Sequence, residues 1–415
     1  MRQFIGILIV SSFNTRPQER HYWEKDEIVR CSVVAKTMSR ERLKKIKSYF
    51  HLVDNSLIYE SNRSEKMFKL KPLLDHLRTK FCKFGQFHKS LCVDEQMIPY
   101  FGNHSCKQFL RGKPVRFGYK VWMLCSGDGY CYNFRVYCGK EESSSASNDT
   151  MCKTSQVVLD LISVLEEPER HTLFLDNLFN SYELLTELKK QGVEASGTAR
   201  ENRFSLKTAP ISDSQALKKQ PRGTFCEVSD GFVSFVKWCD NKVVCFASNY
   251  VGAEPAGECR RRIKGESTKS AIPRPKVAEE YNKPMGGVDL LGKMIGNYRI
   301  QLTSKKWYWR IINNFIEVAL FNAWRIAQNI GHKVSFVQFM RATAAVLIHQ
   351  APQRNSIGQG PAASIPPEIR SIGQHWPVTK LKQRRCRQCK KNTTCGCETC
   401  DIPLHVECFK IFHQP

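Results

Sequence analysis

The chain has 415 residues, and its 64 Lys and Arg residues outnumber 39 Asp and Glu to give a formal net charge of +25. This length is enough to bury a sizeable core in more than one domain. The charge favours a polyanionic partner, most commonly nucleic acid; the alternative is a merely soluble basic protein. The sequence has no apolar run long enough to span a membrane.

The first ten residues, 1–10, place Arg2 before a short apolar run, which is the pattern of a secretory signal peptide. No small-x-small cleavage site follows this run. Most of the 18 cysteines stand singly in apolar segments, as Cys92 and Cys245 do, which is typical of free thiols in a reducing compartment. Both observations argue against secretion.

Two helices are predicted before residue 88. Ser39 is the expected N-cap of the first, which has an apolar face and a basic face. The basic face is either solvated or a contact for phosphate groups: Arg40, Arg42, Lys44, Lys45 and Lys47. The second helix begins near Pro72 and continues towards Phe81.

A short apolar strand over residues 91–100 delivers an acidic pair, Asp94 and Glu95. A carboxylate leaving a buried strand must be paired or bind a metal ion, so Asp94 is a candidate ligand. The basic segment 107–116 follows, and its aromatic residue Phe109 lies between basic residues. It is either a loop that grips a nucleic-acid backbone or a solvated connection.

The next segments have a recognisable order. Residues 119–125 and 130–136 are predicted strands joined by a hairpin, and apolar residues over 157–165 repeat at helical spacing. A fourth strand, 171–175, then runs into Asp176. Three strands, a helix and a fourth strand, with an Asp closing the first and fourth, predict an α/β fold with a ribonuclease-H-like core. In that fold the first and fourth strands are neighbours, so the two carboxylates would jointly hold divalent ions.

After a helix capped by Ser181, the sequence becomes polar over 197–276, with a hairpin predicted from 231–237 and 243–247. We interpret this interval as a β-rich insertion domain. Its run Arg260 to Arg262 is either a DNA contact or simply exposed. Gly286 and Gly287 precede another predicted helix and would allow its backbone to pass close to a strand. Asp289 then lies in the first turn of this helix, the end favoured for acidic residues.

A long helix is predicted over 304–330, and its aromatic residues indicate a buried core position. Residues 350–376 are rich in Pro, Gly, Ser and Gln and are predicted to be a linker. Three Cys/His pairs at two-residue spacing end the chain and predict tetrahedral zinc sites. The candidate ligands are Cys386, Cys389, Cys397, Cys400, His405, Cys408 and His413.

Four blocks in this order resemble the signature blocks of piggyBac transposases and of the piggyBac transposable-element-derived proteins. They are Asp94 to Pro99, Lys113 to Lys120, Leu175 to Phe179, and Tyr281 to Asp289. The resemblance covers nearly the whole chain. It implies a DDE/D-type transposase core in which Asp94, Asp176 and Asp289 hold two Mg²⁺ ions for DNA cleavage and strand transfer.

The resemblance also implies DNA as a partner, a homodimer as the active form and a nuclear location. A domesticated, catalytically inactive protein that binds DNA or chromatin proteins is the alternative. Some active piggyBac transposases have an Asp three residues beyond the position of Asp289, where this chain has Gly292. Family members also have more helical DNA-binding and dimerisation sequence before the segment that matches Met1, and an internal helix where residues 1–10 match.

In the C-terminal zinc domain of the family, alternate Cys/His pairs share an ion. This pattern assigns Cys386, Cys389, His405 and Cys408 to one zinc ion. It assigns Cys397, Cys400 and His413 to a second ion whose last ligand is open, with Cys395 as the nearest spare thiol.

The expected domain organisation has six parts. A helical part of the DNA-binding and dimerisation region covers 1–88, and the two parts of the catalytic core cover 89–196 and 277–348. The insertion domain, the linker and the zinc-binding domain cover 197–276, 349–380 and 381–415.

Overall fold

The computed structural model describes residues 1–26, 28–54, 56, 65–139, 151–204, 213–262, 268–349 and 375–413. The chain falls into two compact units. The first comprises Met1–Phe50, Tyr298–Ser304 and Ile330–Pro415, and the second comprises His51–Asn297 and Lys305–Asn329. The boundary predicted at residue 88 does not separate these units, because residues from His51 onward belong to the second.

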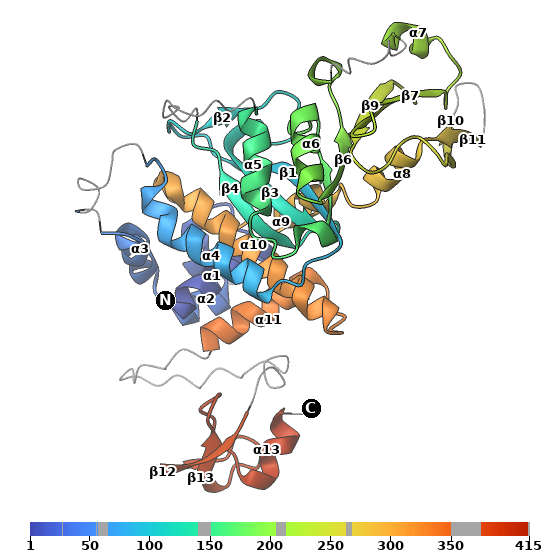
Figure 1. Ribbon diagram of the computed structural model, residues 1–415. Helices are drawn as coiled ribbons and strands as arrows, with labels where there is room; N and C mark the ends of the chain where they lie inside the picture. The colour runs from blue at the N-terminus through green and yellow to red at the C-terminus, as the bar shows by residue number, and fades with distance from the viewer. Residues whose placement is uncertain are drawn as a thin grey trace. The chain divides into compact units, whose positions relative to one another are not determined.

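A nine-stranded sheet is the centre of the second unit, with the order β2-β3-β1-β5-β6-β9-β8-β7 and with β4 paired to β3 (Figure 1). The strands of its first half are β1 (Ser90–Pro99), β2 (Gln108–Phe109), β3 (Phe117–Ser126), β4 (Cys131–Val136), β5 (Thr172–Leu175) and β6 (Glu194–Thr198). β1 pairs antiparallel with β3 and parallel with β5. The order β4-β3-β1-β5-β6 is that of a ribonuclease-H-like core, as the sequence predicts.

Side chains alternate across β1 and separate two helical layers. Leu91 and Val93 lie in a core cluster with α5 (Lys153–Ile162) and α6 (Tyr182–Lys190). The opposite side of β1 contacts α9 (Gly287–Asn297) and α10 (Trp307–Asn329), and α4 (Lys71–Phe84) packs beside α10 on β4. Figure 1 shows these helices on the two faces of the sheet. The Ser181 side chain caps α6 by accepting a hydrogen bond from the backbone N–H of Leu184, as predicted.

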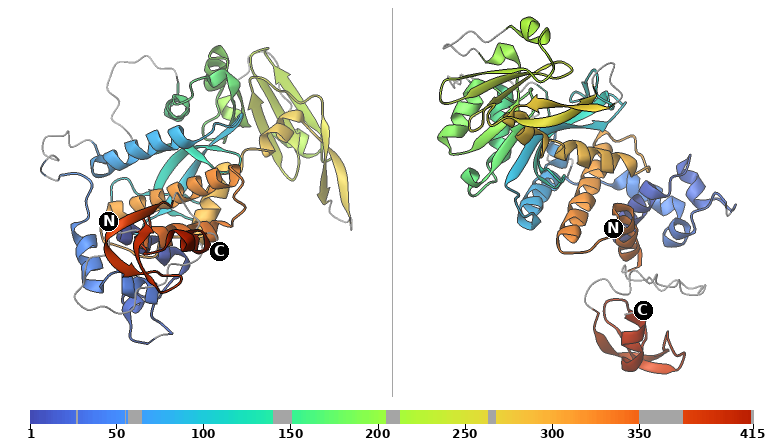
Figure 2. Two further views of the ribbon diagram at one scale, coloured as in Figure 1. Left: turned by 90° about the horizontal axis from the view of Figure 1, so that it is seen from below. Right: turned by 90° about the vertical axis from the view of Figure 1, so that its right-hand side faces the viewer.

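The insertion continues the main sheet, because β6 pairs antiparallel with β9. Its strands are β7 (Phe225–Ser229), β8 (Ser234–Cys239), β9 (Val243–Ser248), β10 (Gly257–Arg262) and β11 (Lys269–Arg274), with helices α7 (Ser214–Lys218) and α8 (Lys276–Asn282). Val236, Trp238 and Phe246 form a second core with α8. The β10–β11 pair is a separate two-stranded ribbon at the edge of the insertion (Figure 2).

The first unit contains α1 (Arg2–Phe13), α2 (Ser32–Thr37), α3 (Arg40–Tyr49) and α11 (Phe336–His349). A Cβ atom at Gly6 of α1 would lie 2.7 Å from Ile348 Cγ1 of α11, so the two helices are in close contact. Residues of the apolar segment such as Phe4 and Ile7 are buried in this helical unit. α11, expected in the second part of the catalytic core, belongs to this first unit.

The C-terminal module has two paired strands and one helix: β12 (Pro377–Arg385), β13 (Asn392–Cys397) and α13 (Val406–His413). Most of the linker predicted over 349–380 lies outside the described residues, but its last part enters β12. In the part of the chain that the structure describes, no helix has the length and apolar character needed to cross a membrane. Short 3-10 helices complete the structure at Glu19–Trp23, Phe68–Leu70, Pro168–Arg170 and Glu201–Arg203.

Candidate active site and metal centres

Asp94 and Asp176 are adjacent where the parallel ladder of β1 and β5 ends. The strand β1 itself continues to Pro99, so the expectation that Asp94 closes the first strand was wrong, whereas Asp176 does follow the fourth. The last residue pair in the parallel ladder of β1 and β5 is Val93 with Leu175, and each Asp follows directly. Val93 and Leu175 both face the core beneath α5 and α6. Because successive side chains point to opposite faces, both carboxylates are directed towards the face that carries α9.

The buried position of Asp94 strongly affects its protonation. Asp94 is only 7% exposed, and this burial raises the pKa of its carboxyl group to about 7. The backbone N–H of Glu95 donates a 2.7 Å hydrogen bond to Asp94, and Lys113 also favours the charged form; Asp176 opposes it. A divalent cation would offset the repulsion between the two carboxylates.

Asp176 is less buried and is contacted from β6. The Thr198 hydroxyl donates to Asp176 Oδ1 at 3.4 Å and lies 3.5 Å from the Tyr281 hydroxyl. Burial raises the pKa of Tyr281, and Asp176 and Asp94 raise it further, which places this phenol near both carboxylates. Tyr281 therefore remains a neutral hydrogen-bonding group beside the acidic pair.

The helix α9 begins directly on the sheet at Gly287. A Cβ atom there would overlap the carbonyl oxygen of Ser126 and lie 2.9 Å from Cys92 Sγ. The Cys92 thiol donates to the same carbonyl at 3.9 Å. A glycine is therefore required at this position, which brings the first turn of α9, with Asp289, to the face of β1 that carries Asp94.

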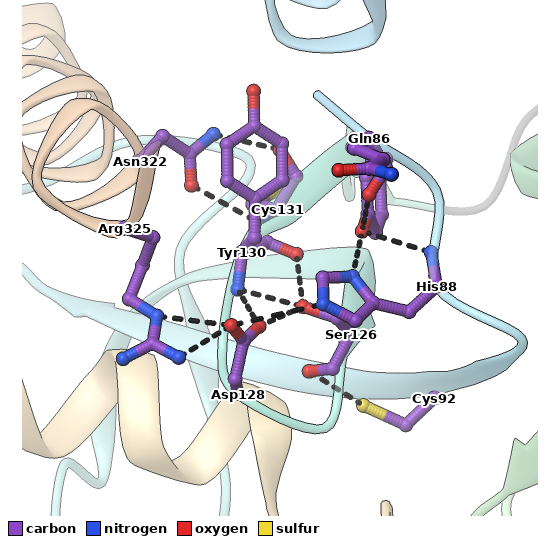
Figure 3. Close-up of polar contacts among 10 residues, drawn as sticks. Gln86, His88, Cys92, Ser126, Asp128, Tyr130, Cys131, Asn322 and Arg325 are labelled. Carbon is purple, nitrogen blue, oxygen red and sulfur yellow. Dashed lines mark hydrogen bonds and ion pairs between the residues drawn. The ribbon is translucent and has the colours of Figure 1, made fainter. Parts of the chain in front are cut away.

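Polar contacts fix the β3–β4 turn that supports this helix (Figure 3). The Arg325 guanidinium of α10 donates from Nε to Asp128 Oδ2 at 3.1 Å. The Asn322 side chain also bonds both backbone groups of Cys131, accepting from its N–H at 2.9 Å and donating to its carbonyl at 2.7 Å. Because Gly287 rests on Ser126, which begins this turn, α10 and α9 are positioned by the same hairpin.

Asp289 lies in the first turn of α9 and is exposed. Lys113 interacts electrostatically with Asp289 and with the other acidic residues. Burial alone would lower the pKa of Lys113, but Glu95, Asp94 and Asp289 together raise it above its ordinary value. The Lys113 ammonium lies 3.3 Å from Glu95 Oε1. Among the described residues, the Asp94, Asp176 and Asp289 oxygens are not gathered within 4.8 Å of one another as the C-terminal ligands are.

Gly292 lies one turn beyond Asp289 and above β1. A Cβ atom added there would be 3.7 Å from Gln96 Nε2, an ordinary contact distance. Gln96 is buried, and its Oε1 accepts a 3.1 Å hydrogen bond from the Asn314 amide of α10. The space beside Gly292 therefore accommodates a small side chain near the acidic site.

The C-terminal module brings the predicted Cys/His ligands into two groups. Cys386, Cys389, His405 and Cys408 form the first, with ligand atoms all within 4.8 Å of one another. Cys389 Sγ lies 3.3 Å from His405 Nδ1, and His405 Nε2 lies 3.0 Å from the Asn392 carbonyl. Because a carbonyl oxygen can only accept a hydrogen bond, this contact places the ring proton on Nε2. The other nitrogen, Nδ1, is then available as a metal ligand.

The second group is completed by a histidine that the sequence analysis missed. His375 joins Cys397, Cys400 and His413, while Cys395 belongs to neither group among the described residues. His375 Nδ1 lies 3.4 Å from Cys397 Sγ and 3.1 Å from Cys400 Sγ. A hydrogen bond from Cys400 lowers the pKa of Cys397 to about 4, with a further contribution from His375, so a thiolate is favoured there.

The two groups fit tetrahedral metal sites in ligand type and number, because four Cys or His ligands are typical of closed structural zinc centres. Alternate pairs of the sequence share a group, as the resemblance implies. His375 lies two residues before β12. In the sequence it falls within a segment whose composition indicates a linker, so it was not recognised as a ligand.

A ribonuclease-H-like sheet with one acidic residue within its first core strand and another directly after its fourth is the architecture of DDE-type transposases, a class that uses divalent metal ions. The family model described as "Transposase IS4" matches residues 1–324. The human PiggyBac transposable element-derived protein 3 is 34% identical over 99% of this chain and 69% of its own length. The human PiggyBac transposable element-derived protein 2 is 31% identical with the same coverage.

The fold is also similar to a solved structure, a piggyBac transposase synaptic complex with hairpin DNA. The TM-score is 0.67 with 20% sequence identity, over 98% of this chain and 87% of that one. The chain therefore belongs to the piggyBac transposase-derived family.

Proposed function

We propose that this chain binds DNA and that Asp94, Asp176 and Asp289 together hold two Mg²⁺ ions for DNA cleavage and strand transfer. The observation that carries the proposal is the parallel register of β1 and β5, which places Asp94 beside Asp176 under the first turn of α9. Bound metal would activate water or a DNA 3′-hydroxyl and stabilise the leaving oxygen.

The chain's own residues prepare the acidic site in three ways. The Glu95 N–H orients the Asp94 carboxylate, and Thr198 orients that of Asp176. The Lys113 ammonium balances part of the negative charge before a cation arrives, and afterwards it is available to a DNA phosphate. These groups hold the carboxylates in place without closing the site.

DNA binding is supported by charge and by the fold. The net charge of +25 is favourable for phosphate contacts. The basic segment 107–116 includes β2 and contributes Lys113 to the acidic site, and its Phe109 ring is 56% exposed, beside Phe117 at 4.8 Å between centroids. The structurally similar piggyBac transposase was solved with hairpin DNA, which is consistent with the same ligand class here.

We further propose that the C-terminal module binds two Zn²⁺ ions, one in each Cys/His group. So small a module has few buried apolar residues, chiefly Leu404 and Phe412, and zinc would supply most of its folding free energy. Its role is either to grip DNA or to bind a protein, since cross-braced zinc folds serve both purposes.

A second candidate function is binding of DNA or chromatin proteins without cleavage, in a domesticated protein. The observation that favours it is Gly292, which has room for a side chain near the acidic site but supplies no carboxylate. Both functions place the protein in the nucleus. The cleaving form would act as a homodimer.

The two functions are separated by assaying DNA that carries piggyBac-type terminal repeats. The cleaving protein nicks this DNA only with Mg²⁺ or Mn²⁺, and Asp94→Asn or Asp176→Asn abolishes nicking while DNA binding persists. Binding without nicking by the unmodified chain, and by a chain extended at its N-terminus, would select the second function.

A further inference from the structure

The β10–β11 ribbon has two chemically different faces. Its strands pair in register, with Arg260 opposite Ala271 and Arg262 opposite Lys269. Residues of one face are partly or fully buried and those of the other are exposed, as the alternation of β-strands requires. The exposed face consists of Glu258, Arg260, Arg262, Lys269, Ala271 and Pro273.

The inner face accounts for the stability of the ribbon. Ile272 is 4% exposed and belongs to the insertion core, and the Trp238 indole N–H donates to the Pro273 carbonyl at 3.1 Å. Arg261 points inward, where its Nε lies 3.2 Å from Asp240 Oδ2 and its guanidinium lies over the Trp238 ring at 5.9 Å. The charge of Arg261 is therefore used within the fold.

The charged side chains of the exposed face are not used within the described part of the fold as Arg261 is. Arg260 and Arg262 are exposed on one strand, and Lys269 is exposed opposite Arg262 on the other. Within the described part of the chain, neither Arg260 nor Arg262 has a salt-bridge partner, whereas Arg261 does. Three cations against the single Glu258 make this face attractive to a polyanion.

The shape of the ribbon indicates which polyanion it fits. Six-residue strands span roughly 20 Å, and paired strands lie about 5 Å apart. The major groove of duplex DNA is about 12 Å wide and admits a two-stranded ribbon. Arg260 and Arg262 are two residues apart on one face, so they lie about 7 Å from each other, and both can reach the phosphates of one groove wall.

We propose that the exposed face of the β10–β11 ribbon is a duplex-DNA contact in which Arg260, Arg262 and Lys269 bind phosphates. This inference rests on the proposed DNA-binding function and adds a specific surface to it. The ribbon lies in the insertion, apart in sequence from Asp94, Asp176 and Asp289, and it contributes affinity rather than chemistry. Figure 2 shows the ribbon at the outer edge of the insertion.

The test is the salt dependence of binding by the zinc-loaded full chain to two duplexes of unrelated sequence. Each lost phosphate contact reduces the slope of log affinity against log salt by about one, measured between about 50 and 200 mM salt. Arg260→Gln/Arg262→Gln should therefore reduce the slope by about two on both duplexes. Adding Lys269→Gln should reduce it further.

A matched control removes the same charge from the same insertion. Lys218 and Lys219 are exposed at the end of α7, and Lys218→Gln/Lys219→Gln should leave the slope unchanged. An unchanged thermal midpoint confirms that each variant is folded. Equal effects of the two double variants, or an unchanged slope in the ribbon variant, would overturn the inference and leave the face available to a protein partner. A wild-type chain without DNA affinity would overturn the proposed function as well.

Discussion

Asp94 and Asp176 lie side by side, each one residue beyond the paired positions Val93 and Leu175 of two parallel strands. The relationship brings two carboxylates that are far apart in sequence to one face of the sheet, where burial makes charge on Asp94 unfavourable. Such a pair must share a proton or bind a cation.

The first prediction concerns pH. The pKa of Asp94 is about 7 in the folded, metal-free chain and about 3.9 in an unfolded one, so the folded state holds more protons between these values. The contribution of Asp94 to stability therefore falls as pH rises from about 4 to 7, by on the order of a few kcal/mol.

Denaturant unfolding of the zinc-loaded chain in buffer without added Mg²⁺ tests this dependence. Asp94→Asn should be more stable than wild type at a pH above 7 and lose this advantage at pH near 4. Mg²⁺ should stabilise wild type above pH 7 but not the variant. Identical pH profiles for the two proteins would show that Asp94 is not buried in the way described.

The second prediction concerns Lys113, whose ammonium lies among Glu95, Asp94 and Asp289. Lys113→Met removes a cation that competes with Mg²⁺, so Mg²⁺ affinity should rise by about tenfold, the effect of roughly 1.4 kcal/mol. Isothermal titration measures it.

Lys120 provides the control for Lys113. Its ammonium lies over the rings of Trp122 and Tyr137, and burial lowers its pKa while Glu95 opposes this shift. Lys120→Met should change Mg²⁺ affinity less than Lys113→Met. Weaker Mg²⁺ binding in Lys113→Met would mean that this lysine supports the site rather than competing with the ion.

The third prediction concerns Gly292. Among the described residues, the nearest atom to its added Cβ is Gln96 Nε2 at 3.7 Å, so Gly292→Asp fits without displacing the backbone and restores negative charge beside the metal site. Mg²⁺-dependent nicking should increase. Gly292→Asn adds the same volume without charge and should not increase it. Equal rates in wild type and Gly292→Asp would show that the extra carboxylate is dispensable here.

The fourth prediction concerns the C-terminal module. His375→Ala should reduce the zinc content of the full chain from two ions towards one, because it opens the second group, whereas Cys395→Ala should retain both. An isolated peptide beginning before His375 should be disordered in chelator and fold with zinc, which supplies on the order of 10 kcal/mol per structural ion. Retained stoichiometry in His375→Ala would remove this residue from the site.

Local sequence patterns predicted the core sheet and its helices because each pattern has a local physical cause. A short apolar run that ends in an acidic pair identified β1, and the Ser39 and Ser181 hydroxyls accept the N-cap hydrogen bonds expected of them. The positions of Asp94 and Asp176 followed from strand order. Their adjacency was expected because this element order is that of a ribonuclease-H-like fold, in which the first and fourth strands are neighbours.

Long-range packing was not available from these patterns. The pairing of β6 with β9, which joins the insertion to the main sheet, leaves no local signal in Glu194–Thr198. His375 was missed because the other ligands of its group, such as Cys397 and Cys400, lie more than twenty residues away along the chain. The sequence around His375 also resembles a linker. The exposure of Asp289 likewise depends on how α9 rests on Ser126.

Binding of Mn²⁺ to the zinc-loaded chain, followed by electron paramagnetic resonance, tests the central claim that the acidic site holds divalent ions. We expect two Mn²⁺ ions per chain, displaced by Mg²⁺ and lost in Asp94→Asn/Asp176→Asn, while zinc content and DNA affinity stay unchanged. A wild-type chain that bound no Mn²⁺, or a double variant that bound it as tightly as wild type, would contradict the claim.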